Sequence, residues 1–310
     1  MEDDMSQLAI LDDVLNGLMR RYKERVPDVQ AILDCMVENK LIQNESDIEN
    51  DHIAFRTLGV PHLGIRSLEK IFLHLGYAKK DAYSFPAKKL NAFWYAPPQP
   101  KYPRIFISEL RVKDLSAAAQ EAILKYTREV TSDPVDQLDL NDSQAIVDYL
   151  HQSLWRTPTW KDYSLLADES EYAAWAIFNR YYLNHFTVSV HNLPESYRTI
   201  AQFNAFIESH GFKLNDAGGK AKTSQDGLLI QSSTVARLVE AEFEDEDGKM
   251  VTKSIPGSYV EFAERKVVPE FEHLKREHTY REHRRDGFEA ANADKIFEST
   301  YSEQIEKARD

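Results

Sequence analysis

The sequence predicts an α+β fold in which one succession of strand, helix and further strands occurs twice. Two strand-like runs, DHIAF and NHFTV, open in a similar way, and a helical pattern that ends at a glycine follows each of them. The spacing from histidine to glycine is also nearly the same, from His52 to Gly76 and from His185 to Gly211. An internal repeat of this kind indicates that the chain contains two related modules.

The first module is preceded by two predicted helices. In LAILDDVLNGLMRRY and VQAILDCMVENKLI, apolar residues recur three and four positions apart, which is the spacing of one helical face. DHIAFRTLGV then alternates with a period of two, as a strand does, and GIRSLEKIFLHLGY returns to helical spacing before a glycine. NAFWYAPP and RIFISELRV complete the module as two further strands.

The second module begins near residue 184 and repeats this order. NHFTVSV predicts a strand, ESYRTIAQFNAFIESHGF a helix, GLLIQSSTVARLVEAEF one or two strands, and SYVEFAER the last strand. The Asp247-Gly248 pair, which lies between the last two runs, is typical of a short hairpin turn. From Val267 onward, the density of charge and of helix formers predicts an exposed helical tail.

These patterns divide the chain into five predicted segments. They are N-terminal helices (1–49), the first module (50–111), a helical insertion or covering layer (112–180), the second module (181–265) and the C-terminal helical tail (266–310). The middle segment contains no recognisable catalytic motif.

Composition excludes several classes of partner. With 310 residues, of which 42% are hydrophobic and 29% charged, the chain has the composition of a folded protein. Its formal net charge of −13 would repel a phosphate backbone, so we expect no nucleic-acid partner. No run approaches the ~20 apolar residues of a membrane span, and MEDDMSQLAI lacks a signal-peptide pattern, so we expect a cytoplasmic protein without a membrane partner. The oligomeric state is not indicated by the sequence.

Three strands place a possible metal ligand on their less apolar face. Side chains two positions apart share one face of a strand, so His52, His185 and Glu261 each oppose an apolar face that can pack beneath helices. Two imidazoles and one carboxylate form a facial triad that holds iron(II) and leaves positions open for substrate and dioxygen. Cys35 is the only cysteine, which disfavours a thiolate site. Each histidine taken singly could instead be a hydrogen-bonded core residue, but their equivalent places in the repeat favour a shared site.

Two further residues are candidates for the same site. Arg56 shares a face with His52, and a guanidinium is suited to bidentate capture of a carboxylate; the alternative is a structural salt bridge. Glu109, in RIFISELRV, is interpreted as the first-module counterpart of Glu261 and could be a fourth ligand or a neighbour of the site.

Taken in order, DHIAFRTLG, LNHFTVSVH, SYVEFAER and RRDGFEAANADKIFEST resemble the 2-oxoadipate dioxygenase/decarboxylase family from about residue 20 to 300. The resemblance implies a vicinal-oxygen-chelate core of paired βαβββ modules that form a concave metal-binding sheet, with extra helices. It implies Fe(2+) bound by His52, His185 and Glu261, with Arg56 as the arginine that binds substrate and takes part in catalysis.

The activity implied by the resemblance is a step of lysine degradation. A 2-oxo acid, 2-oxoadipate in the family, would react with O₂ to give 2-hydroxyglutarate and CO₂. Two alternatives remain open at this point: a glyoxalase-like metal-dependent lyase or isomerase, and a non-catalytic protein that binds a metal and a keto acid. O₂ consumption would distinguish a dioxygenase from the lyase or isomerase, and CO₂ release would distinguish it from the non-catalytic binding protein.

Overall fold

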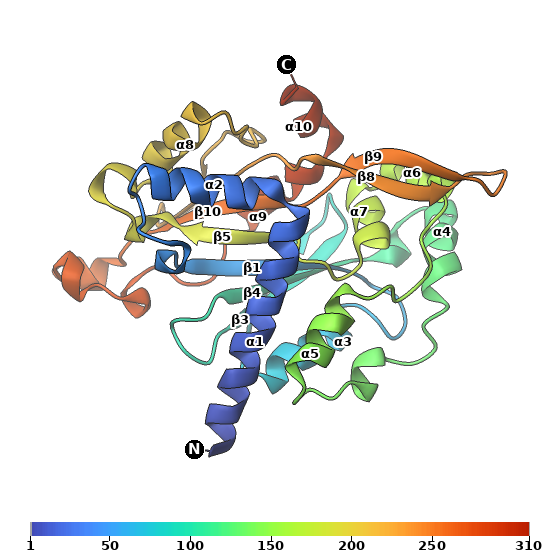
Figure 1. Cartoon of the computed structure of the whole chain (residues 1–310), viewed down its shortest axis with the longest axis horizontal. Coiled ribbons are helices and arrows are strands. Elements are labelled where there is room, and N and C mark those ends of the chain that lie inside the picture. Colours follow the sequence, from blue (N-terminus) through green and yellow to red (C-terminus); the bar gives the residue numbers. More distant parts are fainter. Residues whose placement is uncertain (1, 310) are drawn as a thin grey trace.

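An eight-stranded mixed sheet forms the centre of the protein in a computed structural model that describes residues 2–309 (Figure 1). The strand order is β2-β3-β4-β1-β5-β10-β7-β6. The strands of the first half are β1 (Asn50–Leu58), β2 (Ala78–Phe85), β3 (Leu90–Ala96) and β4 (Arg104–Leu110). The strands of the second half are β5 (His185–Ser189), β6 (Lys222–Thr223), β7 (Leu229–Ser233) and β10 (Tyr259–Arg265).

The two halves have the same order when each is followed outward from the centre. β1 pairs with β5 in antiparallel orientation, while β1 and β4 are parallel, as are β5 and β10. Helix α3 (Ile65–His74) follows β1, and α8 (Ile200–Ser209) follows β5. Each half is therefore a βαβββ unit, which confirms the predicted α+β fold of paired modules.

The remaining elements surround this sheet. The other helices are α1 (Glu2–Arg25), α2 (Pro27–Glu38), α4 (Ala117–Thr127), α5 (Ser143–His151), α6 (Trp160–Glu169), α7 (Glu171–Asn179), α9 (Ala290–Ile296) and α10 (Ser302–Lys307). A separate hairpin, β8 (Leu238–Glu244) and β9 (Met250–Pro256), is inserted between β7 and β10 and projects from the body in Figure 1. None of the helices between residues 2 and 309 combines the length and the apolar character needed to cross a bilayer.

The end of the chain covers the concave face of the sheet. Helix α9 packs against β2 at one edge and against β6 and β7 at the other, so the sheet curls around it. Phe288, Ile296 and Phe297 are all buried. The tail predicted to be exposed is thus exposed only in part, because its apolar residues close the open side of the curled sheet.

Both module helices are anchored at their first turn by a carboxylate from the last strand of the same module. Glu109 of β4 accepts a hydrogen bond from the backbone N–H of Ile65 at 2.8 Å, and Glu264 of β10 accepts one from Ile200 at 2.8 Å. A negative charge at a helix N-terminus satisfies an otherwise unpaired donor and interacts favourably with the helix dipole. The repeat therefore extends to the side chains that hold each helix against its sheet.

We expect Glu109→Ala to lower the free energy of unfolding by about 1–2 kcal/mol, the usual value of a lost N-terminal helix cap. Chemical denaturation measures this change. Glu121→Ala is the matched control, because Glu121 is an exposed residue that pairs with the equally exposed Arg128 and should contribute little. Equal effects of the two substitutions would contradict the anchoring role.

Candidate metal centre

Three ligand-competent side chains converge where the two modules meet. His52 lies on β1, His185 on β5 and Glu261 on β10, which are neighbouring strands. Their nearest ligand atoms all lie within 4.8 Å of one another. The Nε2 atom of His185 is 2.9 Å from Oε2 of Glu261, and the Nε2 atoms of His52 and His185 are 3.3 Å apart. The structure thus brings together the three residues that the sequence nominates as metal ligands.

Each imidazole is oriented by the residue that precedes it. Nδ1 of His52 lies 2.8 Å from Oδ1 of Asp51, and Nδ1 of His185 lies 2.9 Å from Oδ1 of Asn184. An acceptor at Nδ1 favours the tautomer whose Nε2 lone pair is free to bind a metal. Both rings therefore present Nε2 to the centre, which is the arrangement that a metal requires.

The carboxylate behind His52 is held by two buried arginines. Arg265 donates to both oxygens of Asp51, at 2.6 and 2.9 Å, and Arg104 donates to Oδ2 at 3.3 Å. Burial acts to raise the pKa of Asp51, but the two guanidinium groups outweigh it and hold the pKa well below its usual range. Arg104 also donates to Asp286 at 2.6 Å, which ties the C-terminal segment to this network.

The third ligand candidate is a carboxylate whose pKa is lowered. Burial acts to raise the pKa of Glu261, but its electrostatic and hydrogen-bond interactions with His52 and His185 outweigh it and bring the pKa below its ordinary value. Glu261 is only 1% exposed. A buried carboxylate beside two imidazoles supplies a nitrogen and oxygen donor set that suits iron, zinc and related divalent metals.

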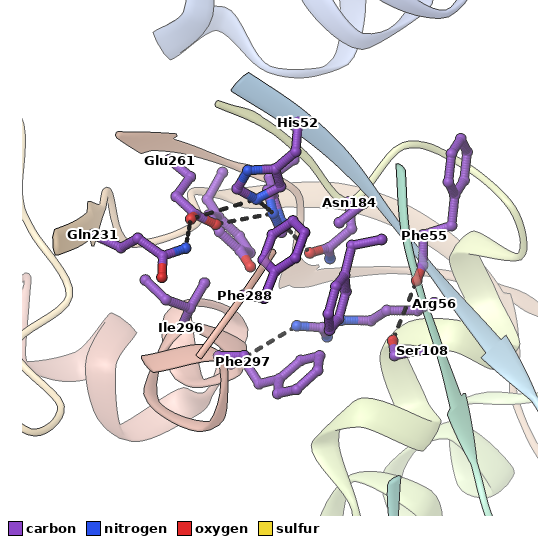
Figure 2. Close-up of a pocket in the computed structure, with 15 residues that line it drawn as sticks. His52, Phe55, Arg56, Ser108, Asn184, Gln231, Glu261, Phe288, Ile296 and Phe297 are labelled. Atoms are coloured by element: carbon purple, nitrogen blue, oxygen red, sulfur yellow. Dashed lines mark hydrogen bonds and ion pairs between the residues drawn. The ribbon is translucent and has the colours of Figure 1, made fainter. Parts of the chain in front are cut away.

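A cavity opens beside the triad on the concave side of the sheet. The empty space among its lining side chains, counted together with its opening to solvent, is about 370 Å³, of which only about 20 Å³ can hold the centre of a water molecule. The lining side chains therefore nearly fill the cavity. Its apolar wall comes partly from the C-terminal segment, and Phe288 lies with its ring centroid 4.8 Å from that of His52 (Figure 2). The polar residues of the lining, besides the triad, are Arg56, Ser108, Asn184, Gln231 and Tyr259.

Arg56 enters this cavity from β1 and is 1% exposed. Its guanidinium donates to Oγ1 of Thr300 at 2.9 Å and to the carbonyl oxygen of Phe297 at 3.1 Å. The rings of Tyr172 and Trp175, both from α7, lie 5.0 Å from its Cζ. Among residues 2–309 no carboxylate forms an ion pair with it. The alternative of a structural salt bridge is therefore contradicted.

Three buried polar atoms of the cavity lining have no hydrogen-bond partner within the described part of the chain. They are Nε of Arg56, the hydroxyl oxygen of Tyr259 and Nδ2 of Asn184. Each can act as a donor, and burial of an unpaired polar group or an unbalanced charge is costly. An anionic ligand with several acceptor oxygens would satisfy them.

Glu109 is not part of this site, contrary to the prediction. The register shows that Phe106, not Glu109, is the counterpart of Glu261, because Phe106 pairs with the residue two positions after His52, just as Glu261 pairs with the residue two positions after His185. Glu109 lies an odd number of positions from Phe106, so it faces the opposite side of the sheet, where it anchors α3.

Several residues that shape the site were not predicted from the sequence. They are Asp51, Asn184, Arg104, Gln231, Tyr259, Arg265 and Phe288. The repeated placement of Asp or Asn directly before the histidine was the available signal for the first two. The others depend on contacts between segments that are distant in sequence.

Comparison with known proteins gives consistent results. The family model described as 2-oxoadipate dioxygenase/decarboxylase matches residues 14–277. A chloroplastic/amyloplastic protein of that name from Oryza sativa subsp. japonica is 44% identical over 302 residues, which cover 94% of this chain and 79% of the relative. A chloroplastic protein of that name from Arabidopsis thaliana is 42% identical over 307 residues, which cover 95% of this chain and 78% of the relative.

Solved structures similar to this protein are consistent with the family match. The crystal structure described as hydroxyglutarate synthase in complex with 2-oxoadipate from Oryza sativa has a TM-score of 0.86 and 42% identity, and the match covers 97% of this chain and 95% of that one. A protein from Ralstonia eutropha described as a putative glyoxalase superfamily member has a TM-score of 0.71 and 22% identity, with 89% and 85% of the two chains covered. The latter similarity shows the fold alone.

We expect Asp51→Ala to lower the free energy of unfolding by about 3–5 kcal/mol, because it leaves two buried guanidinium groups without their shared carboxylate. Chemical denaturation measures the change, and failure to obtain folded protein would agree with it. Asp114→Ala is the control, since Asp114 pairs with Arg111 at the surface. A loss below about 1 kcal/mol for Asp51→Ala would show that the network is not important for stability.

Proposed function

The chain belongs to the 2-oxoadipate dioxygenase/decarboxylase family, and on this basis we propose that it is an iron(II)-dependent enzyme that converts 2-oxoadipate and O₂ to 2-hydroxyglutarate and CO₂. One oxygen atom of O₂ enters the carboxyl group that remains after CO₂ is lost, and the other becomes the hydroxyl group. The reaction therefore balances without an external reductant.

One observation carries the proposal: the same buried cavity contains a ligand set of two histidines and one glutamate, and also an arginine that forms no ion pair with any carboxylate of residues 2–309. His52, His185 and Glu261 would hold the metal, as their converging Nε2 and carboxylate atoms fit it. When bound there, iron(II) would supply a Lewis acid for the 2-oxo acid group and the redox chemistry needed for O₂.

The protein side chains bind and orient the substrate in this proposal. Arg56 binds a substrate carboxylate, and the unpaired donors of Tyr259 and Asn184 are available to further substrate oxygens. Phe288 and Phe297 form part of an apolar wall that keeps bulk water from the site. The rice protein's crystal structure with 2-oxoadipate supports a dicarboxylic 2-oxo acid as the ligand.

Anaerobic reconstitution with iron(II), followed by addition of 2-oxoadipate and O₂, tests the function. We expect CO₂ release and O₂ consumption in equal amounts, with 2-hydroxyglutarate as product. Turnover without O₂ consumption would point to a lyase or isomerase. Binding of 2-oxoadipate without CO₂ release would point to a binding protein. Either result would contradict the proposal.

We expect His52→Ala and Glu261→Ala each to abolish tight iron binding in folded protein, because each removes one of three ligands. Metal content by mass spectrometry and circular dichroism measure the two properties. His74→Ala is the control, since His74 contacts Asn141 at the surface of α3. Full iron occupancy in either ligand variant would refute the metal assignment.

We expect Arg56→Lys to retain the metal but to lose about 30- to 1000-fold in kcat/KM for 2-oxoadipate. An ammonium cannot reproduce two parallel hydrogen bonds to a carboxylate, and the loss corresponds to about 2–4 kcal/mol. Steady-state kinetics per bound metal measures it.

A monocarboxylic 2-oxo acid of similar length identifies which carboxylate Arg56 binds. If Arg56 binds the distal carboxylate, the substitution is nearly silent with this substrate. If Arg56 binds the carboxylate beside the keto group, both substrates are affected alike. Unchanged kcat/KM per bound metal with both substrates would refute a role in binding.

A further inference from the structure

The two oxygens of Glu261 lie in different surroundings. Nε2 of Gln231 donates a hydrogen bond to Oε1 at 2.6 Å, and both side chains are buried. Oε2 instead lies 2.9 Å from Nε2 of His185, whereas Oε1 is 3.5 Å from Nε2 of His52. A metal would replace the contact of Oε2 with the imidazole, but Oε1 would keep the hydrogen bond from Gln231 and so donate less strongly to a metal. The two oxygens are therefore not equivalent toward a metal.

The orientation of the Gln231 amide is set by a residue of the C-terminal helix. Nδ2 of Asn292, on α9, donates to Oε1 of Gln231 at 3.0 Å and to the backbone carbonyl oxygen of Leu229 at 3.3 Å. The backbone carbonyl can only accept, so Asn292 must present its NH₂ group to this side. Gln231 must then turn its oxygen to Asn292 and its NH₂ group to Glu261.

The two hydrogen bonds therefore run in one direction: Asn292 donates to Gln231, and Gln231 donates to Glu261. Without Asn292, the amide of Gln231 could invert and present its oxygen to the carboxylate, which would be repulsive. Gln231 and Asn292 are 3% and 2% exposed, so water cannot readily replace either partner.

We propose that Gln231, oriented by Asn292, is a positioning residue that keeps Glu261 a one-oxygen ligand, an inference that rests on the proposed function. Iron(II) held by His52, His185 and one oxygen of Glu261 would keep positions open for substrate oxygens and O₂. A second oxygen from Glu261 would reduce the number of open positions.

The first experiment examines coordination without turnover. Gln231→Met keeps the size of the side chain but removes the donor, and cobalt(II) alone serves as the probe. We expect the variant to bind cobalt(II) at least as tightly as the wild type, with both oxygens of Glu261 as ligands in a crystal structure or in X-ray absorption. Loss of cobalt binding, or retention of a single Glu261 oxygen, would overturn the proposal. Gln137→Met, at an exposed position, is the control.

The second experiment compares two substitutions at Asn292. Asn292→Leu removes the donor with little change in size. Asn292→Asp keeps the shape but places a second carboxylate beside Gln231, which then competes with Glu261 for the NH₂ group of Gln231. If Asn292 acts only through packing, Asn292→Leu should show the larger loss of activity. The proposal predicts the larger defect for aspartate, measured as kcat/KM for O₂ per bound metal, and this variant also provides a test if Gln231→Met does not fold.

We expect losses of about 10- to 100-fold in kcat/KM for O₂ in Gln231→Met, the usual range for substitutions behind a metal ligand. Anaerobic binding of 2-oxoadipate should change less. If the wild type does not consume O₂ with 2-oxoadipate, the proposed function fails, but the cobalt(II) result still decides the role of Gln231. If the wild type is active and Gln231→Met equals it within about twofold, the positioning role is refuted.

Discussion

The antiparallel pairing of β1 with β5 is the contact on which the rest of the structure depends. It joins the two modules into one sheet, and its register places Ala54 opposite His185, next to the strand position of His52. One imidazole from each module therefore reaches the same point. Because side chains alternate along a strand, a shift of this register by one residue would turn one of the histidines to the other face of the sheet. The site exists only where the modules meet.

The two modules contribute equivalent histidines to the site, but they differ in the charged residues around those histidines. Asp51 and Asn184 orient the two imidazoles in the same way, but only Asp51 is charged and held by arginines. Phe106 of the first module is the counterpart of Glu261 of the second. The second module therefore supplies a metal ligand at the position where the first supplies an apolar residue of the cavity lining. A metal held from one side leaves its other side to the cavity, where a substrate and O₂ can approach.

The C-terminal segment contacts several parts of the site. Asp286 binds Arg104 of the network behind His52, and Asn292 holds Gln231 against Glu261. Phe288 packs on His52, and Thr300 accepts from Arg56. The same segment spans the two edges of the curled sheet. Closure of the cavity and orientation of its polar groups thus depend on one stretch of chain.

The sequence alone determined the repeat, the α+β fold and the three ligand candidates, because period-two alternation and the paired His52 and His185 are local signals. It did not determine the strand register, so Glu109 was misaligned with Glu261, whereas the register pairs Glu261 with Phe106 and leaves Glu109 to anchor a helix. The burial of the tail and the Asn292–Gln231–Glu261 chain were also decided only by the tertiary structure. These features join residues far apart in sequence, and no local periodicity encodes which of them will meet.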